Sequence, residues 1–289
     1  MMKRNLTFYA AIVLTAMSVF FPFAAEAQER VVSVGGDVTE IVYALGKGDA
    51  LVATDSTSVY PKEANDTPKV GYVRQLAAEG VLSLEPDLII ISGAAGPPPA
   101  LEQLRASGVQ MLEMPASYTI EAILEKVDKI ALTLGAVDKG ALLRARIEAE
   151  RRGMKDRVAK LGLSPKVLFF VTLQNGVPQA AGIETAAHGV IELLGGENVF
   201  ASHSGYKSLS LEAAVAADPD IILVMSHHAD RLGGMEAVKS HPAISLTRAV
   251  QENRVILVDP VTVMQFGPRL PSAVADLAEQ IASEQAAGL

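Results

Sequence analysis

The fold is decided by two copies of one short motif, EPDLIII at Glu85–Ile91 and DPDIILV at Asp218–Val224. In each copy a Pro-Asp pair precedes an apolar run, which is typical of a parallel strand buried on both faces. A glutamate stands seven residues before the proline in each copy, Glu79 in the first and Glu212 in the second. Helix–turn–strand units resemble one another, but this does not explain a glutamate at the same offset twice. We therefore interpret the two halves of the chain as duplicated lobes.

Strands and helices alternate around these copies. Apolar runs such as RVVSVGG (Arg30–Gly36) and VLFFVT (Val167–Thr172) precede helical patterns, which is the order of parallel βαβ units. Residues 139–162 are rich in strong helix formers and end at a glycine, as a long helix would. The sequence predicts an α/β fold of two Rossmann-like lobes, residues 28–138 and 163–289, joined by this single long helix, with a ligand cleft between them.

The first 27 residues have the pattern of a cleaved export signal. A short basic start precedes an apolar segment that ends in Ala25-x-Ala27, the small-residue pattern of a signal-peptidase site. The cleavage pattern and the polar residues that follow it disfavour the alternative, a membrane anchor. The chain has no cysteine, which excludes disulfides and a lipid-anchored N-terminal Cys. We expect cleavage near Ala27 and a soluble monomer in the periplasm.

Two tyrosines are expected to face the cleft. Ligands of open α/β sheets bind beyond the carboxyl ends of the strands, and two facing lobes place these ends on either side of one cleft. Tyr72 and Tyr206 occupy comparable points in the two copies, each after a glycine. Tyr72 lies in GYVRQLAAEG (Gly71–Gly80), where Arg74 follows two residues later. On position alone, Tyr72 could also be a half-buried surface tyrosine.

These features resemble the helix-linked solute-binding proteins of ABC importers. Within that class, four stretches resemble the periplasmic haem-binding proteins of bacterial haem importers: GYVRQLAAEGVLSLEPDLII, AAGIETAAHGVIELLGG, GYKSLSLEAAVAADPDIIL and FGPRLP. The resemblance covers nearly all of the exported chain. It implies a protein without enzymatic activity that carries haem as its transported ligand to a membrane permease with its ATPase. An outer-membrane haem receptor system could act upstream.

The resemblance gives Tyr72 the role of axial ligand to the haem iron. Phenolate is a hard, anionic donor suited to ferric iron, and tyrosine ligation of haem is an established option. A free phenol has a pKa of about 10 and is a poor ligand at pH 7, but a neighbouring cation favours the phenolate. The family has a basic residue two positions on, and Arg74 is placed to hydrogen-bond the tyrosine oxygen.

Other residues are weaker candidates for contacts with haem. Two expected loops, SHHADRLGG after DIILVM and VMQFGPRLP after RVILVD, should emerge at the cleft. Together with the second tyrosine they supply Tyr206, His227, His228, Arg231, Met264, Phe266 and Arg269. The alternative interpretation of His227, His228 and Arg231 is that they lie in a solvated loop. The alternative for Arg269 is that it caps a helix. We interpret His188 as a structural or capping residue, and His203 and His241 as surface residues.

The matched glutamates are expected to serve a different partner. In importer binding proteins of the class that this chain resembles, such glutamates dock onto arginines of the two membrane subunits, one per lobe. This implies docking roles for Glu79 and Glu212. A glutamate at a helix N-terminus is also locally favourable, which would account for either residue alone.

One departure from the family concerns the number of haems. Some relatives bind two stacked haems and use a histidine that follows the strand opening the second lobe. Here VLFFVT is followed by LQNGVPQ, which contains no histidine. We therefore expect one haem.

Several other functions remain as alternatives. A corrinoid or ferric-siderophore binding protein with the same lobes would leave the Tyr72–Arg74 pair unexplained. An exported enzyme lacks support, because the sequence has no Gly-x-Ser-x-Gly, His-Glu-x-x-His or Gly-x-Gly-x-x-Gly motif. A zinc site would have only His227 and His228 close together. The net charge of −8 argues against nucleic acid as a partner.

Overall fold

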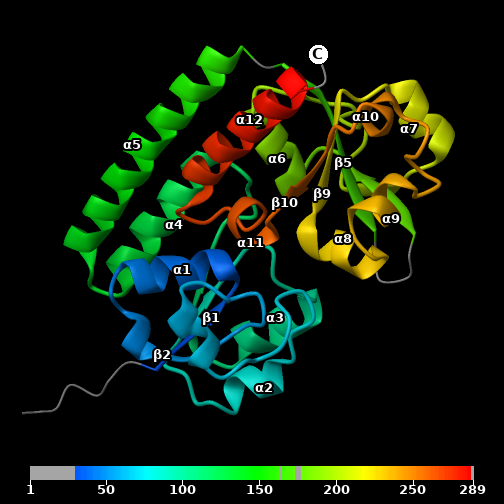
Figure 1. Cartoon of the computed structure of the whole chain (residues 1–289). Coiled ribbons are helices and arrows are strands. Elements are labelled where there is room, and N and C mark those ends of the chain that lie inside the picture. Colours follow the sequence, from blue (N-terminus) through cyan, green and yellow to red (C-terminus); the bar gives the residue numbers. More distant parts are fainter. Residues whose placement is uncertain (1–29, 163, 173–176, 288–289) are drawn as a thin grey trace, which may run out of the picture.

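The computed structural model describes residues 30–162, 164–172 and 177–287. Two α/β lobes are joined by one long helix, α5 (Val137–Leu161), and the C-terminal helix α12 (Leu270–Ala287) packs along it (Figure 1). This arrangement confirms the predicted fold class. The predicted signal peptide with cleavage near Ala27 and the stretch 173–176 lie outside the described residues. Within the described ranges, no helix is both long and apolar enough to cross a membrane.

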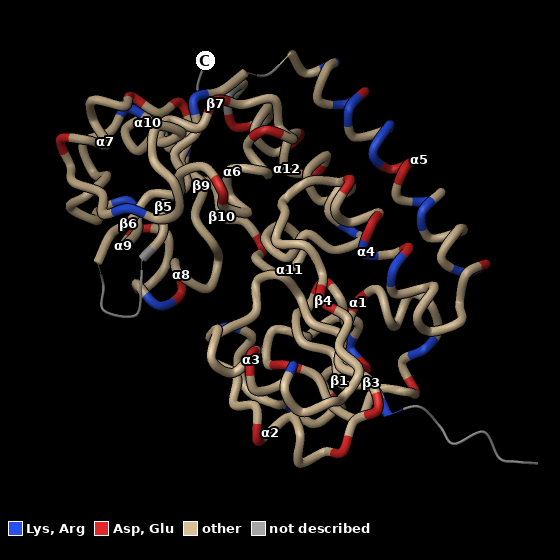
Figure 2. Tube along the Cα trace, turned by 180° about the vertical axis from the view of Figure 1, so that it is seen from behind, with Lys and Arg blue, Asp and Glu red and all other residues tan. Residues whose placement is uncertain are grey.

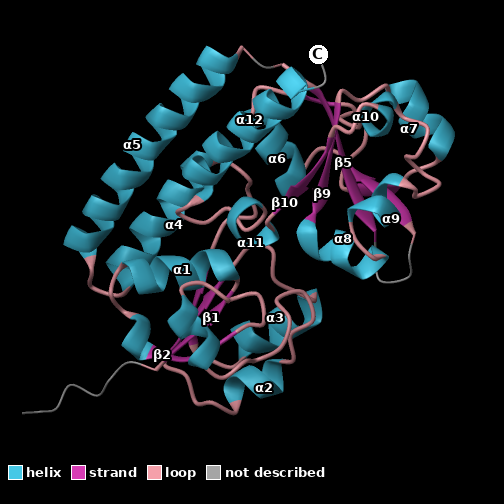
Figure 3. Cartoon of the chain, viewed as in Figure 1, coloured by secondary structure: helices cyan, strands magenta, loops and turns pink. Residues whose placement is uncertain are grey.

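The N-lobe, residues 30–136, is built on a parallel four-stranded sheet (Figure 3). Its strand order is β2-β1-β3-β4, with β1 Val31–Val34, β2 Leu51–Thr54, β3 Leu88–Ile91 and β4 Gln110–Glu113. The connections carry α1 Gly36–Ala44, η1 Gly48–Ala50, η2 Lys62–Asp66, α2 Ala78–Leu82, α3 Pro98–Ala106 and α4 Ile120–Thr133.

The C-lobe, from residue 164 onward, has a mixed six-stranded sheet of order β10-β9-β5-β6-β8, with β7 also paired to β5. β9, β10 and β7 run parallel to their partners, whereas β6 and β8 pair antiparallel, which the expectation of βαβ units missed. The strands are β5 Lys166–Thr172, β6 Pro178–Ala181, β7 Glu197–Asn198, β8 Tyr206–Ser208, β9 Ile221–Met225 and β10 Val255–Val258. The remaining helices are α6 Ala186–Leu193, α7 Leu211–Ala217, α8 Ser226–Leu232, α9 Met235–Lys239, α10 Arg248–Gln251 and α11 Pro260–Val263.

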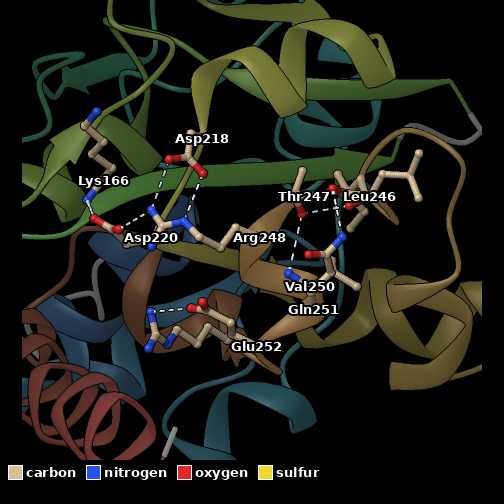
Figure 4. A network of polar contacts seen from close by, with 11 residues as sticks. Lys166, Asp218, Asp220, Leu246, Thr247, Arg248, Val250, Gln251 and Glu252 are labelled. Atoms are coloured by element: carbon tan, nitrogen blue, oxygen red, sulfur yellow. Dashed lines mark hydrogen bonds and ion pairs between the residues drawn. The ribbon is translucent and has the colours of Figure 1, made fainter. Parts of the chain in front are cut away.

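The repeated Pro-Asp motif makes the same contacts in both lobes. In the N-lobe, Asp87 accepts the backbone N–H of Arg30 at 2.9 Å and donates its own N–H to the Arg30 carbonyl. In the C-lobe, Asp220 does the same with Lys166, at 2.8 Å in both directions (Figure 4). Each aspartate therefore fixes the start of its strand against the start of the neighbouring strand, at the end of the sheet away from the carboxyl ends.

One hydrophobic core runs through both lobes. It contains Val38 and Ile41 of α1, Ile147 of α5, Phe169 of β5 and Val274 of α12, all buried. Each sheet has one smaller core on its outer face, in the N-lobe and in the C-lobe respectively. Basic and acidic residues occur along the whole length of α5 (Figure 2). The lobes therefore share a packed layer of helices in addition to the single chain connection through α5.

Candidate functional site

A cavity of about 1230 Å³ lies between the lobes. Its lining comes from segments that directly follow β1, β2, β3 and β4 in the N-lobe and β9 and β10 in the C-lobe. The cavity therefore sits at the carboxyl ends of the strands of both sheets, where ligands of open α/β sheets bind. A solvent-filled space of this size between two lobes can hold a large planar ligand.

Tyr72 and Arg74 lie in a loop that is held mainly by backbone hydrogen bonds. The Gly71 carbonyl accepts the N–H of Ser56 at 2.8 Å, and the Tyr72 carbonyl accepts the N–H of Gln75 at 2.8 Å. Gly71 has φ of 103°, which favours glycine at this position. Both side chains line the cavity, and neither forms a hydrogen bond or ion pair with another described residue. Tyr72 is 43% exposed, so its phenol is open to a ligand.

Tyr206 lines the cavity from the opposite lobe, at the first residue of β8. Burial raises its pKa, the charge of Arg74 opposes that rise, and Tyr118 and Tyr72 add to it. The phenol of Tyr206 is therefore protonated at neutral pH and can donate a hydrogen bond. The same interactions place Arg74 of the N-lobe within electrostatic reach of Tyr206 across the cavity.

His227, His228 and Arg231 line the C-lobe wall. The expected loop is instead the helix α8, and the rings of His227 and His228 meet edge to face, with centroids 4.2 Å apart. Burial, followed by His227 and Arg231, lowers the pKa of His228 to about 4. Burial and then Arg231 also lower the pKa of His227. This wall therefore presents neutral imidazoles at pH 7, and Nδ1 of His228 is buried with no hydrogen-bond partner among the residues that the structure describes.

The floor of the cavity contains Met264, Gln265 and Phe266. Phe266 is buried with φ of 53°, and its ring meets the edge of the Tyr118 ring at 5.4 Å. Nε2 of Gln265 donates to the carbonyl of Thr57 at 2.9 Å. Met264 and Phe266 therefore both line the cavity, and their contacts with haem stay a prediction.

Arg269 is not among the residues that line the cavity. Its Nε donates to Oε1 of Glu40 at 3.0 Å, and its guanidinium carbon lies 3.5 Å from the ring centroid of Tyr60. The structure thus gives this arginine protein partners, in place of the ligand contact or helix cap that the sequence suggested.

Sequence reasoning missed a buried ion pair below the cavity. Nζ of Lys126 lies 2.6 Å from Oδ2 of Asp37, which also accepts the hydroxyl of Ser92 at 3.1 Å. All three residues line the cavity. The available signal was a lysine in the apolar stripe of α4, between Ile123 and Ile130, where a helix faces its core.

Glu79 and Glu212 are exposed in the first turns of α2 and α7, one in each lobe (Figure 1). The backbone N–H of Glu212 itself, and then the hydroxyl of Ser210, lower the pKa of Glu212. Both side chains are available to an external partner, and their docking role stays a prediction. No group of three or more metal-ligating side chains occurs in the described part of the chain.

Comparison with known proteins gives consistent matches. The profile of the periplasmic binding protein family matches residues 31–262. The periplasmic heme-binding protein RhuT from Roseiflexus sp. RS-1, in apo form, has a TM-score of 0.84 and 36% identity, over 89% of this chain and 99% of that chain. The periplasmic heme-binding protein BhuT, in complex with two hemes, has a TM-score of 0.83 and 35% identity, over 89% and 98%. The vitamin B12-binding protein of Vibrio parahaemolyticus is 30% identical, over 90% of this chain and 92% of its own length.

Proposed function

Because the chain belongs to the periplasmic binding protein family, we propose that it binds haem in the interlobe cavity through Tyr72 and delivers it to an ABC permease. The family supplies substrate-binding components of ABC transporters, and its members and structural neighbours are binding proteins, not enzymes. The observation that carries the proposal is the placement of Tyr72 and Arg74. Both side chains face a cavity of about 1230 Å³, and neither forms a hydrogen bond or ion pair with another described residue.

The chemistry of this wall suits ferric haem. A phenolate at Tyr72 would supply the anionic oxygen that ferric iron prefers, and Arg74 lines the same cavity with a positive charge. Tyr206 is protonated and would act as a hydrogen-bond donor, because burial raises its pKa. Its role is therefore different from that of Tyr72, although the two tyrosines are matched in sequence.

The remaining lining suits a flat, apolar ring with anionic side chains. Val59, Met264 and Phe266 provide apolar contact area. Arg231 provides a cation at the cavity wall that could pair with a propionate, since among the described residues its Nε donates only to a backbone carbonyl, that of His227. The charge of Lys126 is already balanced by Asp37, so Lys126 is a poor candidate for this role.

A corrinoid is the second candidate ligand. It is favoured by the relative from Vibrio parahaemolyticus, a vitamin B12-binding protein at 30% identity over nearly the whole chain. A corrinoid needs no phenolate ligand, so under this alternative Tyr72 would contribute only packing or a hydrogen bond.

Absorption spectroscopy of purified protein separates the two candidates. Titration with hemin should produce a Soret band and break at one equivalent, because the segment after β5 offers no histidine for a second haem. Parallel titration with cyanocobalamin should show no saturable binding. Tight binding of cobalamin without binding of hemin would replace haem by a corrinoid, and a break at two equivalents would contradict the expected stoichiometry.

A further inference from the structure

The segment Met264–Arg269, here called the strap, follows the C-lobe strand β10 and helix α11 but is fastened to the N-lobe. Three long-range polar contacts hold it. Gln265 donates to the carbonyl of Thr57 at 2.9 Å, Lys126 donates to the carbonyl of Phe266 at 3.2 Å, and Arg269 donates to Glu40 at 3.0 Å. All three partners belong to the first lobe, more than a hundred residues earlier in the chain.

Of these contacts, Arg269–Glu40 joins a buried carboxylate to a partly buried arginine, whose side chain is 26% exposed. Glu40 is 5% exposed, and its second oxygen lies so close to Gly267 that a Cβ there would stand 3.1 Å from it. Tyr60 covers the guanidinium of Arg269. Removing either member of such a pair leaves its partner's charge or donors buried without compensation, which is strongly unfavourable. The pair is therefore a strong fastening point that does not line the cavity.

A second segment crosses in the opposite direction. Residues 115–118 follow β4 of the N-lobe and line the cavity, and the ring of Tyr118 contacts Phe266. The carbonyl of Tyr118 comes close to α6 of the C-lobe, because a Cβ at Gly189 would lie 2.5 Å from its oxygen. Each lobe thus sends one segment to the other, and the two segments meet beneath the cavity at the Tyr118–Phe266 contact.

We propose that the strap is a lock on the spacing of the two lobes, and that Arg269 and Glu40 are positioning residues that set how fast the ligand leaves the cavity. The floor residues Gln265 and Phe266 lie between the fastening point and the ligand space. Loss of the Arg269–Glu40 contact would let Gln265 and Phe266 move away from the N-lobe. The two lobes could then move apart while the packed layer of α5 and α12 stays in place. The part of this inference that concerns release rests on the proposed function; the part that concerns lobe spacing does not.

Lobe spacing is measured with two spin labels and no ligand. The chain has no native cysteine, so Gln103→Cys on α3 and Glu236→Cys on α9, both exposed, place one label on each lobe. Double electron–electron resonance should give a narrow distribution of the distance between the two labels in the wild-type background. This distribution should broaden in both Arg269→Gln and Glu40→Gln. Arg269→Lys, which keeps the charge, should recover part of the narrow distribution.

Arg248→Gln is the matched control. Arg248 also pairs with carboxylates, Asp218 and Asp220, but at the end of the C-lobe away from the cavity (Figure 4). It should leave the distance distribution unchanged. Circular dichroism verifies that each variant is folded, and Tyr60→Leu, which removes only the covering ring, serves as a milder second variant.

Release is measured by transfer of bound hemin to apomyoglobin. Arg269→Gln should raise the dissociation rate of hemin about tenfold and leave its association rate nearly unchanged. The absorption spectrum of the bound state should stay the same. A distance distribution in Arg269→Gln that superimposes on the wild type overturns the lock. Faster release without a change in distance overturns it as well, because Arg269 would then act on the ligand. Failure of hemin to bind at all would contradict the proposed function, and the distances would still decide the lock.

Discussion

The two lobes begin their central strands in the same way but present different chemistry to the cavity. Asp87 and Asp220 make equivalent backbone contacts, and the residues two positions before them, Glu85 and Asp218, share a positive φ of 48° and 42°. The cavity-facing tyrosines differ. Tyr72 is 43% exposed in a loop, whereas burial raises the pKa of Tyr206 at the start of β8. The strand starts are therefore alike in the two lobes, whereas the walls that face the cavity differ.

The largest effect is expected where the lobes still match, at Glu79 and Glu212. We predict that Glu79→Ala combined with Glu212→Ala abolishes haem delivery to a reconstituted permease, while each single variant is intermediate. Charge pairs at a rim set orientation and association rate, and salt should weaken delivery by the wild type because such charges are screened within about 10 Å. Hemin affinity should be unchanged in all variants, since neither residue lines the cavity. Uptake by the double variant at the wild-type rate would rule out docking.

The next effect tests where the lobes differ. Tyr72→Phe should remove the charge-transfer band of phenolate-ligated ferric haem and weaken affinity at least tenfold, about 1.4 kcal/mol. Tyr206→Phe should keep the band, because burial raises the pKa of Tyr206 and so disfavours its phenolate as the iron ligand. Tyr43→Phe is a control tyrosine outside the cavity lining. An unchanged spectrum in Tyr72→Phe, or loss of the band in Tyr206→Phe, would reverse the assignment of the two walls.

The parts of the fold that depend on local sequence could be predicted, and the parts that depend on distant partners could not. The Pro-Asp copies and the composition of α5 lie in continuous stretches, so the two lobes and their helical link were accessible. The strand β8 has only three residues and is defined by its pairing with β6. The stretch SHHADRLGG carries polar residues and a terminal Gly-Gly, which favoured a loop, whereas the structure has a helix over Ser226–Leu232.

The same distinction between local sequence and distant partners applies to the candidate site. Tyr72 and Arg74 are neighbours in sequence, so their shared position at the cavity could be predicted. The Gln265–Thr57 contact joins residues 208 positions apart, and no local pattern indicates it. Arg269 was expected near the ligand because its loop follows a strand, but Glu40 and Tyr60 provide partners outside the cavity lining.

A smaller effect should come from the neutral imidazoles of the C-lobe wall. Burial lowers the pKa of His228 to about 4, from an ordinary value near 6.5. As pH falls below about 6.5, the imidazole takes up a proton in the unfolded chain but stays neutral in the folded one. Folding stability therefore declines between pH 6.5 and about pH 4, and it is recovered when the pH is returned to neutrality. His228→Leu should reduce this decline by about 2 kcal/mol at pH 5, since the unfolded-state pKa lies about 1.5 units above that pH and each unit is worth about 1.36 kcal/mol. Urea unfolding at pH 7 and pH 5 provides the measurement, and equal pH dependence in both proteins would contradict it.

The smallest effect is expected at Arg74, the cation of the N-lobe wall that has no counterpart two residues after Tyr206, where Ser208 stands. Arg74 is exposed, so solvent weakens its influence on Tyr72. We predict that Arg74→Ala retains bound haem with affinity lowered only a few-fold, about 1 kcal/mol or less. Loss of this positive charge should weaken the bond between the iron and the phenolate oxygen and shift the acid transition of the bound haem. Arg74→Lys should keep the wild-type transition, since the charge remains. Superimposable pH titrations of bound haem in the wild type and Arg74→Ala would show that this arginine does not tune Tyr72, and would leave the exposure of the tyrosine as the difference between the two walls.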